Sequence, residues 1–149
     1  MKPKFASLFM SAGMLLALGA GRAQAQIVDR IEVDVPFAFH AGRATLPAGN
    51  YVIEEASGVN PRVLEIASPD GRTSAFITVE SAEAKATPEH TELIFNKYGN
   101  EYFLSKVFEE GNDLGSEVPP THYETALGKG MTRSEHHVSA RHPAQAMAK

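Results

Sequence analysis

The sequence predicts an all-β protein: an antiparallel sandwich or small barrel of six to seven strands, with a short C-terminal helix and a disordered tail. Two observations predict this class. Short segments alternate between apolar and polar side chains with period two, which is the spacing of a half-buried strand. Turns rich in glycine and proline separate these segments without a helix between them, as in antiparallel sandwiches and barrels.

Residues 1–25 have the composition of a secretory signal. Lys2 and Lys4 give a positive start, the run 5–20 carries no charge, and 23–25 supplies small residues for cleavage. The apolar run is shorter than the roughly 20 residues that a membrane-spanning helix needs. We therefore expect export to the periplasm or the medium, a mature chain of residues 26–149, and no transmembrane segment after cleavage.

A β-domain is expected over residues 26–127. Its first strand covers 31–39, where Pro36 lacks an amide donor and indicates an edge strand or a bulge. Turns at 40–43 and 46–50 lead into a strand at 51–54. Two hairpins follow, 62–67 with 73–80 and 91–95 with 102–108, and we expect a loop over 81–90 because Pro88 would stop a helix.

The segment 118–128 predicts a short helix. Thr121 can cap its start, Glu124 follows three residues later as in a capping box, and Gly128 can end it. Tyr123 and Leu127 lie four residues apart, a spacing that lets both pack on the sheet.

Residues 128–149 contain no aromatic residue and no apolar period, so we expect a disordered tail. Charge divides at the same boundary. Residues 26–127 hold seven basic and seventeen acidic side chains, a net charge of −10, whereas 128–149 hold four basic and one acidic, a net charge of +3. The whole chain, at −4, is therefore polarised.

Three motifs occur together in the β-domain: VPFAF at 35–39, LPAGNY at 46–51 and KYGNEYFL at 97–104. The pattern resembles a group of small exported bacterial proteins of unknown function, which pair a PFxF…LPAGxY opening with a YG…YFL hairpin. The resemblance covers roughly residues 31–127. These motifs mark turns and core strands, so the resemblance implies the fold and carries over no catalytic residue. The basic tail with its histidines departs from the pattern.

The composition excludes several kinds of chemistry. Without cysteine the chain has no disulfide scaffold, thiol nucleophile, thiolate zinc site or iron–sulfur ligand. The acidic balance argues against nucleic acid as a partner, because phosphate binding needs a surplus of Lys and Arg. We expect no cofactor.

Catalytic candidates are few. His40 and Asp70 with Ser68 or Ser74 supply the residue types of a hydrolytic triad, but the chain has no G-x-S-x-G elbow. The pairs 54–55 and 109–110 are adjacent acids, and neighbouring side chains of a strand point to opposite faces, so neither pair can flank a glycosidic bond. We expect no enzyme, with a small secreted hydrolase as an alternative.

The tail offers a possible metal site. His136, His137 and His142 are imidazole ligands of the kind that zinc, copper and nickel prefer, although their spacing matches no closed metal motif. Weak metal binding by this tail is a second alternative.

Four aromatic residues near turns and strand ends are the candidate ligand-binding residues: Tyr51, Tyr98, Tyr102 and Phe103. Exposed rings at such places stack on sugars or peptides. The sequence therefore favours a non-enzymatic binding or structural accessory of the cell envelope. Such a protein would hold an envelope protein or a glycan by these rings, or by strand addition at a sheet edge.

Overall fold

The structure, a computed structural model, describes residues 30–56 and 63–143. The predicted signal at 1–25 lies outside this part of the chain. The elements are β1 (Ile31–Val35), β2 (Phe39–Ala41), β3 (Ala44–Leu46), β4 (Gly49–Glu55), β5 (Val63–Ala67), β6 (Ser74–Thr78), β7 (Glu80–Glu83), β8 (Glu92–Tyr98), β9 (Glu101–Phe108), β10 (Leu114–Glu117), α1 (His122–Gly128) and β11 (Arg133–Arg141). The all-β prediction is confirmed, whereas the expected six to seven strands are too few.

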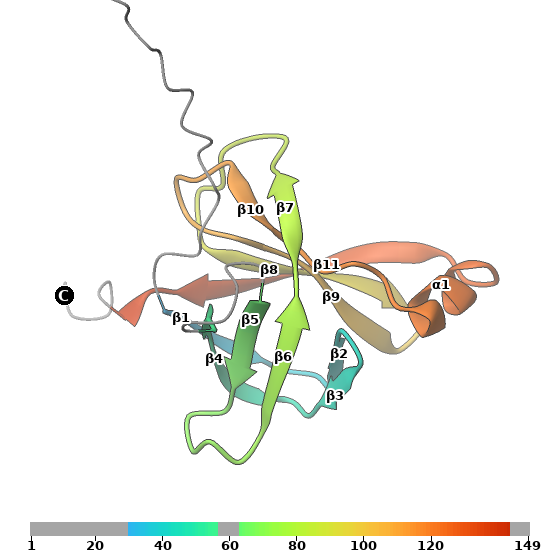
Figure 1. The fold of residues 1–149 in the computed structure, drawn as a ribbon. Helices are drawn as coiled ribbons and strands as arrows, with labels where there is room; N and C mark the ends of the chain where they lie inside the picture. Colours follow the sequence, from blue (N-terminus) through green and yellow to red (C-terminus); the bar gives the residue numbers. More distant parts are fainter. Residues whose placement is uncertain (1–29, 57–62, 144–149) are drawn as a thin grey trace, which may run out of the picture.

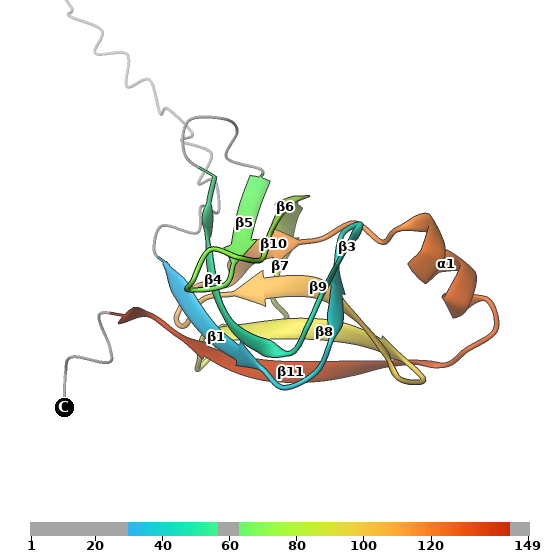
Figure 2. The ribbon, with the colours of Figure 1, turned by 90° about the horizontal axis from the view of Figure 1, so that it is seen from below.

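The strands form one nearly closed, barrel-like sheet (Figures 1 and 2). Its order is β3-β2-β9-β8-β11-β1-β4-β5-β6, and β10 pairs with both β9 and β7 beside this path. Neighbours are antiparallel except β2 and β9, which meet in parallel at His40 and Phe103. Strands distant in sequence, such as β1 and β11, therefore lie side by side.

The core is made of buried strand side chains, which alternate along β1, β5 and β6 and form runs of three residues in β4, β8 and β9. Phe39 packs edge-to-face on Phe95 and on Tyr51, with ring centroids 5.4 Å apart in both pairs. Ile31 and Ile53 are fully buried between them and the remaining strands. Burying each side chain of this size stabilises the fold by roughly 1.5–3 kcal/mol.

Pro36 lies where the first predicted strand divides in two. The alternation expected over 31–39 is confirmed at Ile31, Val33, Val35 and Phe39, all of which are buried. The strand itself ends at Val35, because Pro36 has no amide to continue a ladder. Before Pro36 the chain pairs with β4 and β11, and after Pro36 the next strand, β2, pairs with β9. β1 has neighbours on both sides, so the expectation of an edge strand is wrong.

Both predicted hairpins are confirmed as β5–β6 and β8–β9. Gly71 and Gly99 occupy the turns with φ of 68° and 60°, a region that favours glycine. The loop expected over 81–90 starts later, since β7 extends to Glu83 by pairing with β10.

Helix α1 is confirmed with its predicted cap: the Thr121 hydroxyl accepts a hydrogen bond from the Glu124 amide at 3.1 Å. The packing differs from expectation. Tyr123 is 51% exposed, and the buried residue of the helix is Glu124, which is 5% exposed. Within the described ranges, no helix is long and apolar enough to cross a membrane.

The expected disorder of residues 128–149 is wrong over β11, which lies between β8 and β1. Only Val138 of this strand is buried. Its sequence therefore shows no apolar period, which is why the sequence predicted disorder here. Its order comes instead from ladders on both sides, which satisfy its backbone groups. Residues 144–149 lie outside the described residues.

Candidate functional site

The four predicted aromatic residues do not form an exposed stacking surface. Tyr51, Tyr98 and Phe103 are buried, and Tyr102 is half-buried with its ring stacked 3.8 Å from Phe37. The Tyr51 hydroxyl is also used, because it donates to the Pro47 carbonyl at 2.6 Å. Position near a turn was a poor indicator of exposure, because neighbouring side chains cover these rings: Tyr102 packs on Phe37, and Phe103 packs on His40 and Tyr98.

The three candidate metal ligands contact different partners. The His136 ring meets Phe37 and Tyr102 edge-on, whereas His137 Nδ1 lies 2.9 Å from Glu92 Oε2. His142 Nε2 lies 3.1 Å from Thr91 Oγ1. No group of three or more His, Asp or Glu side chains in the described part of the chain is arranged to hold a metal ion.

The residues proposed for a triad are also separated. Ser68 donates to Asp70 at 2.6 Å within the β5–β6 turn, and this hydrogen bond lowers the pKa of Asp70. His40 lies on β2, where its Nε2 is 2.6 Å from Glu101 Oε2 and its Nδ1 is 3.1 Å from Thr45 Oγ1.

A hydroxyl, an imidazole and a carboxylate thus form a chain that links β3, β2 and β9. The His40 ring also stacks on Phe103, with centroids 4.5 Å apart. None of the three concave regions described below contains Thr45, His40 or Glu101. The chain of hydrogen bonds therefore joins three strands outside these three regions.

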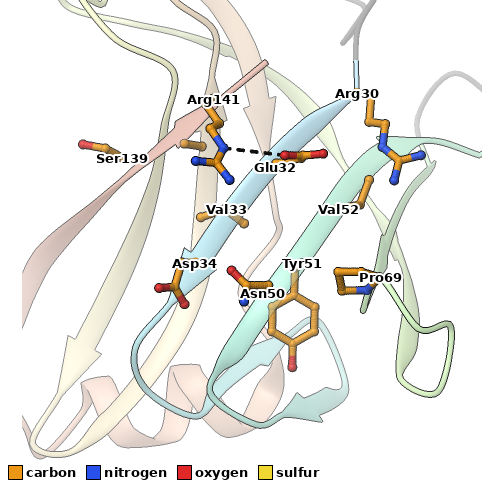
Figure 3. A pocket seen from close by; sticks show the side chains of 11 residues that line it. Arg30, Glu32, Val33, Asp34, Asn50, Tyr51, Val52, Pro69, Ser139 and Arg141 are labelled. Carbon is orange, nitrogen blue, oxygen red and sulfur yellow. Dashed lines mark ion pairs between the residues drawn. The ribbon is translucent and has the colours of Figure 1, made fainter. Parts of the chain in front are cut away.

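A polar depression of about 640 Å³ lies over β11, β1 and β4 (Figure 3). Alternate residues of these strands direct Glu32, Asp34, Asn50, Ser139 and Arg141 into it, and Arg141 Nε is 3.5 Å from Glu32 Oε2. Charged and amide groups of both hydrogen-bonding types line this surface, which suits a polar ligand.

A second depression, of about 380 Å³, lies between α1 and the sheet and contains Glu124. Asn96 Nδ2 donates to Glu124 Oε1 at 2.8 Å, and the Tyr98 hydroxyl also donates to this carboxylate. Burial and the neighbouring Glu124 charge raise the pKa of Tyr98. Glu124 therefore holds α1 against β8, a role for which the capping-box pattern was the only sequence signal.

The third region lies at the free edge of β6. Within the described ranges β6 pairs with β5 alone, and its residues include neither a charge nor a proline. A mostly apolar groove of about 870 Å³ lies along this edge, lined by 42–44, 75–78, 118–122 and Thr125. Phe76 is 65% exposed there.

The β6 edge lacks several features that usually protect edge strands from pairing with other chains. Natural edge strands are usually blunted by lysine, proline, bulges or very short length. β3, at the other end of the sheet, is only three residues long and is followed by Pro47. β6 has five residues and, within the described ranges, none of these protections.

The chain has no match among known protein families, curated proteins or solved structures. The fold and these regions define the class: an all-β, barrel-like domain whose sheet ends in an unprotected strand.

Proposed function

We propose that this chain is an exported, non-enzymatic binding or structural accessory of the cell envelope, which holds a partner by adding an extended segment to β6. The observation that carries the proposal is the unprotected β6 edge with Phe76 exposed beside an apolar groove. The signal-like composition of residues 1–25 supports the compartment.

In strand addition, the backbone and the side chains of the incoming segment make different contributions to binding. The unpaired amides and carbonyls of β6 would bond the incoming segment and provide affinity. Alternate side chains of that segment would enter the groove between β6 and residues 118–122, which provides selectivity. Phe76 contributes an aromatic contact at the centre of the strand.

The test is selection of peptides from a random-sequence displayed library on the purified chain, followed by counter-selection on Phe76→Lys. This variant removes the aromatic contact and places a charge on the edge, so we expect it to lose the selected peptides. Hydrogen exchange should show that bound peptides protect the amides of Ser74–Thr78.

Met131→Lys is the matched control, because Met131 is also an exposed apolar residue, 48% exposed, but lies beside Gly99 in the β8–β9 turn. It should bind the peptides as the unmodified chain does. Peptides that bind Phe76→Lys equally well, or that protect another strand, would contradict the proposal.

Glycan binding is a second candidate, favoured by the polar depression of Figure 3. Asp34 and Asn50 present carboxylate and amide groups on adjacent strands, a combination suited to neighbouring sugar hydroxyls. Titration with soluble oligosaccharides would reveal such binding, and Asp34→Ala should abolish it if the depression is the site.

A further inference from the structure

We infer that the segment received by β6 is β6 of a second copy of this chain, so that two barrels join edge to edge as an antiparallel pair centred on Phe76. The inference rests on the proposed function, because it names the partner of the same edge. The observation behind it is the order of residues from Arg72 to Glu80. The residues before Phe76 match those after it in size and charge when two such segments run antiparallel.

The edge is longer than β6 itself. Burial alternates without interruption from Ser74 to Glu80, with Ala75, Ile77 and Val79 buried and the residues between them exposed. Figure 1 shows β7 continuing along the direction of β6, and Glu80, the first residue of β7, is exposed like Phe76 and Thr78. The Arg72 side chain, 86% exposed, lies at the other end, where its Nε is 3.5 Å from Asp70 Oδ2 of the same turn.

Two identical antiparallel strands pair about a two-fold axis, and residues directly opposite each other share a face. With Phe76 on the axis, each outer residue faces a suitable partner in the other copy. Phe76 faces Phe76, Ser74 faces Thr78, and Arg72 faces Glu80. On the inner face, the small Ala75 faces the larger Ile77.

The charges select this register. The two-fold axis produces the Arg72–Glu80 pair twice, so a cation and an anion meet at both ends of the joined strands. A shift of two residues in one direction places Ser74 opposite Phe76 and Glu80 opposite Asp70, and a shift in the other direction places Phe76 opposite Thr78 and Arg72 opposite Ala82. Both shifts lose the ring pair and both ion pairs, and the first also sets like charges against each other. An edge so matched to itself favours a second copy over an arbitrary peptide.

The test is sedimentation velocity of the purified chain from micromolar to submillimolar concentration. We expect a concentration-dependent dimer that Phe76→Lys abolishes. Arg72→Glu and Glu80→Arg should each weaken the dimer about tenfold or more, because each places like charges opposite each other at both ends. An equimolar mixture of these two variants should recover the dimer, since opposite charges then meet at both ends again.

Both charge positions are exposed, and unchanged thermal unfolding midpoints would show that the variants fold. Should either charge variant fail to fold, the loss or retention of the dimer in Phe76→Lys decides whether the inference holds. A dimer that is indifferent to these changes overturns the inference, and so does a chain that stays monomeric. A monomeric chain whose β6 still binds the selected peptides leaves the proposed function standing. A monomer that binds none of them overturns both.

Discussion

At the scale of single residues, Glu124 carries the attachment of α1 to the sheet. It is a buried carboxylate that accepts hydrogen bonds from Asn96 and Tyr98. Glu124→Ala leaves the half-buried Asn96 amide and the buried Tyr98 hydroxyl without their acceptor, so we expect the free energy of unfolding to fall by about 1–3 kcal/mol. Glu124→Gln keeps one acceptor oxygen and should cost less.

Denaturant unfolding measures this effect. Glu135→Gln is the matched control, because Glu135 is an exposed carboxylate on the rim of the same depression. It should change stability by less than about 0.5 kcal/mol. Equal losses in Glu124→Ala and Glu135→Gln would contradict the role given to Glu124.

The raised pKa values of two tyrosines make the stability of the fold depend on alkaline pH. Burial raises the pKa of Tyr51 above its ordinary value of 10.0, and burial with the Glu124 charge does the same for Tyr98. The folded chain thus keeps these phenols protonated where the unfolded chain loses the proton. Their contribution is complete below about pH 10 and is lost as the pH rises through the folded pKa values.

We therefore expect the free energy of unfolding to decline above about pH 10, and to decline less steeply in Tyr98→Phe. At neutral pH that variant should lose about 1 kcal/mol with its hydrogen bond to Glu124. Tyr123→Phe, at an exposed ring, should follow the unmodified chain. Chemical unfolding at a series of pH values checks this, and identical alkaline slopes for all three chains would count against it.

At the scale of elements, β11 joins the two halves of the sheet. It is bonded to β8 on one side and to β1 on the other, and Arg141 reaches Glu32. Removing it exposes two unpaired edges and opens the core beside Val138. A chain ending at Gly130 should therefore lose cooperative unfolding, as measured by circular dichroism on heating.

A chain ending at Pro143 is the matched control, because it keeps β11 and removes only residues 144–149. It should unfold cooperatively like the full chain. Cooperative unfolding of the chain ending at Gly130, with an unchanged midpoint, would mean that β11 is dispensable, as a disordered tail would be.

At the scale of the whole molecule, the acidic domain and basic tail expected from composition are parts of one sheet. On β11, Arg141 lies beside Glu32 of β1, and the His137 ring lies beside Glu92 of β8. The charge division along the chain is thus reduced in space. What remains distinctive is the break in the barrel at β6, where the peptide and dimer experiments apply.

The sequence by itself determined the all-β class, both hairpins and the capped helix, because period-two burial, left-handed glycines and the Thr121 cap act between residues close along the chain. Its candidate site residues were less informative. Whether Tyr51 and Tyr98 are buried depends on strands that arrive from elsewhere in the sequence.

The tertiary structure alone decided the place of β11, the burial of Glu124 and the exposure of β6. Each depends on contacts between segments far apart in sequence. The local sequence pattern does not show which backbone groups are hydrogen-bonded to another strand. β11 is ordered with one buried side chain because it has two neighbours. β6, the edge that we propose for binding, has one paired neighbour within the described ranges.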